Sequence, residues 1–248
     1  MRDHFIAEGE VVLRVLLGAS RFQAESLLIA EKRIDRLLPL LAGLAEDFPI
    51  YRVPQEVLDG VAGFNIHRGI LALGRRAEAV TAESLLQGAA PDAVILVLFG
   101  IANHDNIGGI FRNAAGFGAA AVLLDEQCCD PLYRKAIRVS VGASLIVPFA
   151  RLEAGTDPLG TLERFGYEAL ALSPQGPAIL CNFKARGRVA ILLGTEGPGL
   201  PSTILNRIPG VAIPMAPGFD SLNVATTSGI VLHHLANNRS HSAESGER

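Results

Sequence analysis

The sequence predicts an α/β protein with two domains, of which the larger, C-terminal one is built on a parallel sheet. In this part of the chain, nearly continuous apolar runs alternate with helical segments. Such runs are typical of strands covered on both faces, and their alternation with helices indicates parallel crossover connections. The expected strands cover residues 93–99, 120–124, 169–172, 189–193 and 211–213.

The sequence divides into four segments, which are residues 1–80, 81–91, 92–237 and 238–248. Residues 1–80 predict a small α/β unit, residues 81–91 a linker around a polar helix that begins after Thr81, and residues 92–237 the parallel-sheet domain. The last stretch is rich in Ser, His and Glu, so we expect a disordered tail there. The helices expected around the strands of the larger domain cover residues 107–117, 131–139, 158–165, 201–207 and 222–236.

The N-terminal unit shows shorter signals for both kinds of element. An amphipathic helix is expected at residues 10–18, a Glu/Lys/Arg-rich helix at residues 30–41 and a short helix after Pro54, at residues 55–61. The expected extended segments cover residues 27–29, 50–53 and 69–73.

Composition limits the classes of function. The chain has 248 residues, is 49% hydrophobic and carries a net charge of −3, so no overall basic field indicates nucleic acid and any such site must be a local patch. The three cysteines lack disulfide or metal-ligand spacing, which favours a reducing cytoplasm. We expect neither a secretory signal nor a membrane span, because no apolar run is long enough.

The loop after the first strand of the larger domain leads into a helix that carries an arginine. Asn106 is the expected N-cap, and Ile107 and Ile110 start the apolar stripe that faces the sheet. Arg112 lies on nearly the opposite side of the helix, and its five donors suit a phosphate or another oxyanion. An ordinary capped helix with a solvated arginine is the alternative.

Two further loops that follow strands are rich in glycine and polar residues. Residues 194–199 contain three glycines, which allow close approach of the backbone to a ligand, and include Glu196; a generic turn is the alternative. The other loop ends at Asp220 and Ser221, an expected helix cap, with Asn223 just beyond. Folding alone requires one cap there, so this polar trio suggests a ligand. Ligands of parallel α/β sheets bind at the carboxyl ends of strands, where all three loops would lie.

Several common sites are missing from the sequence. There is no G-x-G-x-x-G fingerprint, no P-loop and no G-x-S-x-G elbow. His233 and His234 lack the H-E-x-x-H pattern, so we expect no metal.

Taken in order, the three loops resemble the SpoU/TrmH family of RNA 2′-O-ribose methyltransferases, in the SPOUT class. Residues 138–143 and 148–149 also resemble this family, and the N-terminal unit resembles the ribosomal-protein-like RNA-binding domain of many members. The resemblance runs through Asn103, Asn106, Gly108, Arg112, Phe117 and Gly118, then residues 193–200, and then Ile213, Pro214, Met215 and residues 221–224.

The resemblance implies a deep trefoil knot, a homodimer and S-adenosylmethionine as the methyl donor. The cofactor-binding positions that it implies, largely through the backbone, are Gly194, Thr195, Ile213, Met215 and Leu222. Arg112 matches the family's catalytic arginine, and we interpret it as a ligand of the phosphate and of the developing alkoxide because a guanidinium is a poor base. A base role, as proposed for the family, is the alternative. The residues expected to orient it and the ribose hydroxyl are Asn106, Glu196, Ser221 and Asn223.

We therefore expect S-adenosylmethionine-dependent methylation of a ribose 2′-hydroxyl in ribosomal or transfer RNA. The RNA would need local cations, although an ordinary surface charge is the commoner role for each of them taken singly. A non-catalytic RNA-binding or assembly protein with the same fold, and an unrelated α/β enzyme that binds nucleotide phosphates, are the alternatives. The candidate RNA-binding residues are Arg68, Arg75, Arg76, Arg134 and Arg138, with Arg21 and Lys135 beside them.

Overall fold

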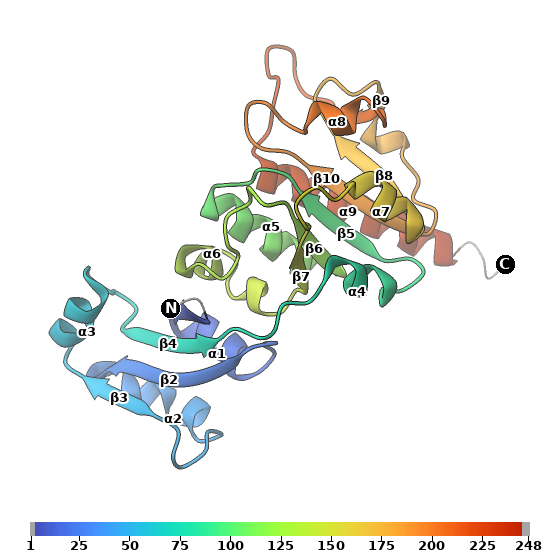
Figure 1. The fold of residues 1–248 in the computed structure, drawn as a ribbon. Helices are drawn as coiled ribbons and strands as arrows, with labels where there is room; N and C mark the ends of the chain where they lie inside the picture. The colour runs from blue at the N-terminus through green and yellow to red at the C-terminus, as the bar shows by residue number, and fades with distance from the viewer. Residues whose placement is uncertain (1–2, 245–248) are drawn as a thin grey trace.

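The structure, a computed structural model that describes residues 3–244, contains two α/β domains (Figure 1). The smaller domain has a four-stranded sheet in the order β1-β4-β2-β3, in which only the β2–β3 pair is parallel. The expected helices and extended segments are present, but the first strand, β1, was not predicted. The elements are β1 (His4–Glu8), α1 (Glu10–Leu17), β2 (Gln23–Ala30), α2 (Ile34–Leu41), β3 (Ile50–Val53), α3 (Gln55–Ala62) and β4 (Ile70–Arg75).

The larger domain has a seven-stranded sheet in the order β7-β6-β5-β10-β8-β11-β9, with every neighbouring pair parallel. This confirms the predicted parallel sheet and its five strands. Two short strands, β7 and β9, were not predicted; they have three and two residues. The strands are β5 (Val94–Leu98), β6 (Ala121–Leu124), β7 (Phe149–Arg151), β8 (Tyr167–Leu172), β9 (Ala178–Ile179), β10 (Arg188–Leu193) and β11 (Gly210–Ala212).

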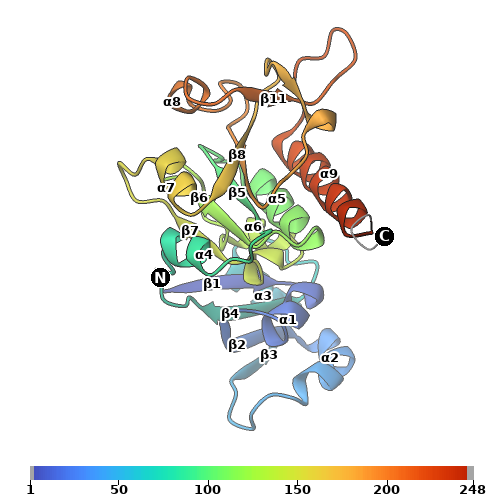
Figure 2. The same cartoon turned by 90° about the vertical axis from the view of Figure 1, so that its right-hand side faces the viewer.

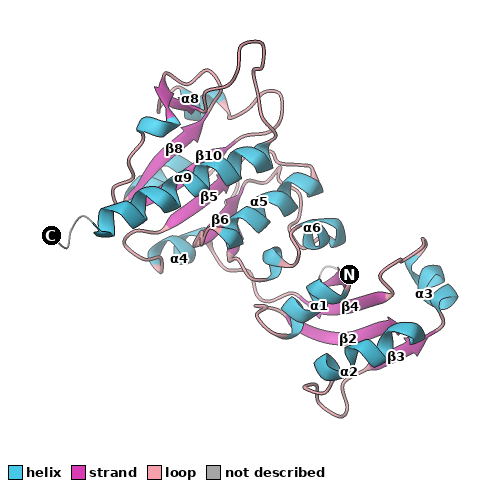
Figure 3. Ribbon diagram, turned by 180° about the vertical axis from the view of Figure 1, so that it is seen from behind, coloured by secondary structure: helices cyan, strands magenta, loops and turns pink. Residues whose placement is uncertain are grey.

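Helices cover both faces of this sheet (Figures 2 and 3). On β5, Leu96 and Leu98 belong to the core under α5 and α9, whereas Ile95 and Val97 belong to the core under α4 and α7. This double burial explains why the strands read as uninterrupted apolar runs. The helices are α4 (Ala82–Gln87), α5 (His104–Gly116), α6 (Arg134–Val139), α7 (Pro158–Arg164), α8 (Ser202–Leu205) and α9 (Val224–Glu244).

The helix ends differ from those expected. Helix α5 begins at His104, and its N-cap is Asn103, whose Oδ1 accepts from the Asp105 N–H at 2.8 Å; Asn106 is inside the helix and is 5% exposed. Helix α9 runs to Glu244, so the disorder predicted from residue 238 is wrong as far as this residue. Residues 245–248 of the predicted tail lie outside the described residues.

Two glycines on α5 allow α6 and α9 to pack closely against it. A Cβ at Gly108 would lie 2.7 Å from Cβ of Val139 on α6, and a Cβ at Gly109 would lie 2.7 Å from Cβ of Ala225 on α9. Any larger residue would push one of these helices away. The close packing therefore fixes the start of α9 beside the first turn of α5.

The two domains share one hydrophobic core and a charged cluster. Side chains of Leu132, Ile137 and Leu145 from the larger domain pack into the core of the N-terminal sheet. Across the same boundary, the carboxylate of Glu8, which is 5% exposed, pairs with the guanidinium groups of Arg134 and Arg138. The interface therefore combines apolar burial with a nearly buried ion pair.

We predict that Glu8→Gln destabilises the protein by about 2 kcal/mol, because two partly buried guanidinium groups then lose their shared counter-charge. Urea unfolding of the full chain measures this free energy. Glu25→Gln is the control, since Glu25 pairs with the exposed Arg75 in the same sheet. An equal loss of stability in both variants would contradict the role of the interface charge.

Candidate functional site

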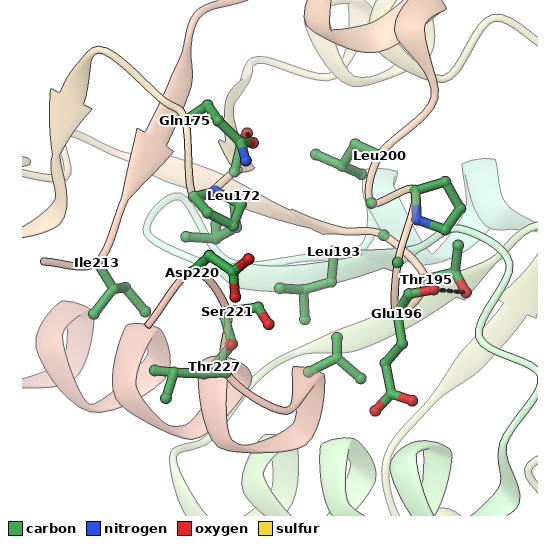
Figure 4. Close-up of a pocket in the computed structure, with 18 of the residues that line it drawn as sticks. Leu172, Gln175, Leu193, Thr195, Glu196, Leu200, Ile213, Asp220, Ser221 and Thr227 are labelled. Atoms are coloured by element: carbon green, nitrogen blue, oxygen red, sulfur yellow. Dashed lines mark hydrogen bonds between the residues drawn. The ribbon is translucent and has the colours of Figure 1, made fainter. Parts of the chain in front are cut away.

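A cavity of about 610 Å³ opens at the carboxyl ends of β8, β10 and β11 (Figure 4). It brings together all five positions expected to hold the cofactor, two from the loop after β10 and three from the segment between β11 and α9. Sequence reasoning placed these segments at one edge of the sheet, and the structure shows that they line one space. The five are Gly194, Thr195, Ile213, Met215 and Leu222.

The loop after β10 folds back on itself because Gly194 has no side chain. A Cβ at this position would overlap the backbone of Gly199 and Leu200. The turn is closed by the Gly199 N–H, which donates to the Thr195 carbonyl at 3.1 Å, and Gly197 and Gly199 take positive φ values of 92° and 73°. The loop thus presents main chain to the cavity, which only glycine at these positions allows.

Three of the predicted catalytic side chains meet at the rim of the cavity. Asn106 donates from Nδ2 to Oε1 of Glu196 at 2.9 Å, and Asn223 donates from Nδ2 to Oδ1 of Asn106 at 2.9 Å. Asn223 Nδ2 also lies 3.2 Å from Oε1 of Glu196. We call this set of three residues the amide–carboxylate triangle; it joins α5, the loop after β10 and the start of α9.

Asn223 has a second function as the N-cap of α9. Its Oδ1 accepts from the backbone N–H groups of Ala225 and Thr226 at 2.9 and 3.2 Å, so the cap predicted at Asp220 and Ser221 is in fact Asn223. The Asn223 side chain therefore accepts hydrogen bonds from the backbone of α9 through its oxygen and donates to the other members of the triangle through its nitrogen. The exposed pair Asp220 and Ser221 lines the cavity opposite Thr195 (Figure 4).

Arg112 lies outside this cavity. Its side chain is exposed on α5, as expected from the helical wheel. Among residues 3–244 it has no ion pair or hydrogen-bond partner, whereas most of the other arginines have one. The structure therefore leaves this guanidinium free for a ligand on the surface of α5.

One wall of the cavity was not predicted. Leu172, the last residue of β8, and residues 173–175 after it line the cavity beside the expected loops. The signal was present, because Ser173, Pro174 and Gly176 form a glycine- and proline-containing loop directly after a predicted strand. Its close approach to β11 depends on Gly176, whose missing Cβ makes room for the backbone of Gly210.

Four of the five arginines proposed to bind RNA pair with carboxylates of the chain itself. Arg75 pairs with Glu25, and Arg76 pairs with Asp130 across the domain boundary. Arg134 and Arg138 share Glu8, as described above. Arg68 is exposed, and its stem lies against Gly9. Of the two cations beside them, Lys135 pairs with Asp105, and Arg21 lies over the rings of Phe22 and Phe149.

Other kinds of chemistry find little support in the described part of the chain. No group of three or more His, Cys, Asp or Glu side chains there is placed to hold a metal ion, and none of its helices has the length and apolar character of a membrane span. All three cysteines are free, and burial raises the pKa of Cys128 to about 12 and that of Cys129 to about 11. These two thiols are thus poor nucleophiles at neutral pH.

Comparison with known proteins agrees with this geometry. A sequence model of the SpoU rRNA Methylase family matches residues 93–233. An uncharacterized tRNA/rRNA methyltransferase of Mycobacterium bovis is 41% identical over 95% of this chain and 82% of its own length. A 23S rRNA (guanosine-2′-O-)-methyltransferase RlmB of Vibrio parahaemolyticus is 28% identical over 96% of this chain and 98% of its own.

A solved structure shows the same fold over both domains. The crystal structure of an AdoMet-bound rRNA methyltransferase from Sinorhizobium meliloti superposes with a TM-score of 0.77, at 22% identity, over 97% of this chain and 88% of that one. Because the family match spans more than half of the sequence and a relative reaches 41% identity, the chain belongs to the SpoU rRNA Methylase family of RNA methyltransferases.

Proposed function

We propose that this protein transfers a methyl group from S-adenosylmethionine to a ribose 2′-hydroxyl of structured RNA. The observation that supports this most directly is the amide–carboxylate triangle at the rim of the cavity. It sets Asn106, Glu196 and Asn223 beside loops that the resemblance assigns to the cofactor. The names of the relatives, which include a 2′-O-methyltransferase and an AdoMet-bound enzyme, support the same reaction.

The cavity fits S-adenosylmethionine in size and chemistry. Its volume of about 610 Å³ is within the range of small-molecule sites, roughly 300–1,000 Å³. Leu172, Leu200 and Leu205 provide an apolar wall suited to a flat base, and the folded main chain after Gly194 provides carbonyl and N–H groups for polar edges. The acidic Asp220 at the opening suits a cationic part of the molecule.

The residues of this chain position the reaction rather than supply a strong base. A sulfonium donor already carries an excellent leaving group, so alignment of the acceptor oxygen and exclusion of water provide much of the acceleration. The Glu196 carboxylate is fixed by two amide donors, so it presents a defined acceptor at the rim. Ser221, on the opposite side, can hold the ribose hydroxyl in line.

Arg112 is proposed to bind the phosphate beside the target ribose and to stabilise the developing alkoxide. Because it lies outside the cavity of its own subunit, we propose a homodimer in which the site takes residues from two copies. Half-exposed apolar side chains at the end of α5, on β9, just before α9 and on α9 support a protein contact. These are Phe117, Ile179, Leu222 and Ile230, which are 38–41% exposed.

Three further expectations also remain proposals: the trefoil knot, the class of RNA and the location in the cell. The trefoil knot stays a prediction, as does the choice between ribosomal and transfer RNA. A cytoplasmic location is proposed because RNA is the substrate and all three cysteines are free. Mapping 2′-O-methyl sites in RNA from a deletion strain against its parent would identify the target nucleotide.

We predict that Arg112→Ala lowers methyl transfer roughly a hundredfold and leaves cofactor affinity unchanged, since its charge acts on the phosphate and alkoxide. Tritium transfer from labelled cofactor into RNA measures the first quantity, and calorimetry measures the second. Arg112→Lys should also lose most activity, because a point charge lacks the bidentate geometry. Near-normal turnover of the alanine variant would remove Arg112 from the mechanism.

We predict that Gly194→Ala abolishes detectable cofactor binding, because a Cβ there forces the loop away from Gly199 and Leu200. Calorimetric titration of the full chain tests this. Gly116→Ala is the matched control, since no atom lies within 4 Å of its added Cβ and its φ is not positive. Unchanged binding by the Gly194 variant would show that the loop does not hold the cofactor.

We predict that Asn223→Asp loses roughly a hundredfold in methyl transfer while α9 stays capped. Aspartate keeps the acceptor that caps the helix, but it replaces the amide donor with a carboxylate that faces Glu196. Circular dichroism checks the helix and tritium transfer the activity. If activity survives, the triangle is structural only.

A further inference from the structure

We propose that aromatic side chains at the domain boundary form a stacking surface for unpaired nucleotides of the RNA substrate. This surface consists of Tyr133 and Phe64, each held on one side by a neighbour, and we call it the boundary aromatic pair. The inference rests on the proposed function for the identity of the polymer. It names a mode of recognition, base stacking, that cationic residues alone would not provide.

The rings of this pair are anchored but remain accessible. Tyr133 stacks on His104 with ring centroids 4.2 Å apart and is still 52% exposed. Phe64, in the loop between α3 and β4, lies under the guanidinium of Arg134, whose Cζ is 4.3 Å from the ring centroid, and is 42% exposed. A ring that is already fixed loses little conformational entropy when a base stacks on it.

The two anchored rings are connected through the start of α6, because Arg134, which contacts Phe64, directly follows Tyr133. Tyr133 immediately precedes α6 in the larger domain, while Phe64 comes from the smaller domain. The loop after α3 and the start of α6 face each other across the domain boundary (Figure 3). Each domain therefore contributes one accessible ring beside the start of α6.

The surroundings of the pair carry an excess of positive charge. Arg134 and Arg138 share the single carboxylate of Glu8, which leaves one guanidinium charge uncompensated. Arg68 adds another, because its stem lies against Gly9, the residue after Glu8. Cations beside exposed aromatic rings are the combination that binds single-stranded nucleic acid, with phosphates on the charges and bases on the rings.

The surface leads toward the proposed catalytic centre. His104, which supports Tyr133, is the first residue of α5, and Asn106 of the amide–carboxylate triangle is two residues farther along the same helical turn. A strand that stacks on Tyr133 would thus be close to the rim of the cavity. Its unpaired bases would place a neighbouring ribose within reach of the site.

The chain offers a direct optical test, because it has no tryptophan and only three tyrosines. Tyr167 is buried, and Tyr51 is 58% exposed on β3, at the edge of the N-terminal sheet opposite β1. Stacking of a base on a tyrosine quenches its fluorescence. An unstructured oligouridylate should therefore quench the wild-type emission, and a Tyr133→Phe variant should bind it equally well without that quenching.

Binding of the same oligouridylate to the full chain, measured by fluorescence anisotropy of a labelled strand, tests the energetic contribution. Tyr133→Ala and Phe64→Ala should each weaken binding on the order of tenfold, in line with the loss of one base–aromatic stack. Tyr51→Ala is the matched control and should bind as the wild type does, and Tyr51→Phe should keep the RNA-induced quenching. An RNA duplex of equal length should be affected little by any of these variants.

Each outcome bears on one proposal. Wild-type affinity of Tyr133→Ala and Phe64→Ala, or full quenching in Tyr133→Phe, would overturn the stacking surface and leave the methyltransferase proposal standing. If the wild-type protein showed normal quenching and binding but transferred no methyl group to cellular RNA, the methyltransferase proposal would be overturned and the stacking surface would stand. Calorimetric binding of S-adenosylmethionine by both alanine variants confirms that they are folded.

Discussion

The hydrogen bonds among Asn106, Glu196 and Asn223 are the constraint on which the site depends. They join helix α5, the glycine-rich loop after β10 and the start of helix α9. Glu196 and Asn223 lie 90 and 117 residues after Asn106 in the sequence. Each of the three residues uses its polar atoms for another member, so removing one leaves the others with unsatisfied groups at a partly buried position. The contacts that fix the proposed catalytic side chains are thus also contacts that hold the local fold together.

The triangle in turn depends on close helix packing around α5. Gly108 and Gly109 admit α6 and α9 on two sides of this helix, and α6 also carries the arginines that bind Glu8 of the N-terminal domain. A displacement of α6 relative to α5 would therefore change the contacts both at the domain boundary and near Asn106. The shared apolar core makes such displacement costly, because it would expose buried side chains of both domains. The two domains act as one unit with respect to the site.

The sequence was sufficient to predict the features that depend on pattern. Buried strands produced apolar runs, and the three polar loops after them converge because parallel strands end at one edge. The sequence alone did not show which of two residues of the same type has which role. Asn103 and Asn106 both precede apolar helix residues, and only the structure shows that the first caps α5 while the second is bonded to Glu196. Likewise, no local pattern reveals that Arg76 and Arg134 pair with carboxylates distant in sequence. Long-range pairing of charges and very short strands are tertiary properties, which a single sequence does not encode locally.

The pairing of these arginines changes the physical basis on which RNA binding should be argued. A chain with a net charge of −3 cannot rely on a broad electrostatic field, and most candidate cations are occupied by its own acids. Near the domain boundary, a small excess of positive charge lies beside accessible aromatic rings. Phosphate contacts alone would make affinity depend steeply on salt and would bind duplex and single strand alike. Rings add an attraction that requires unstacked bases, and it is less sensitive to salt. Under this proposal an acidic protein selects flexible regions of a folded RNA by stacking, while the glycine-supported loops proposed to hold the methyl donor act independently of the RNA sequence.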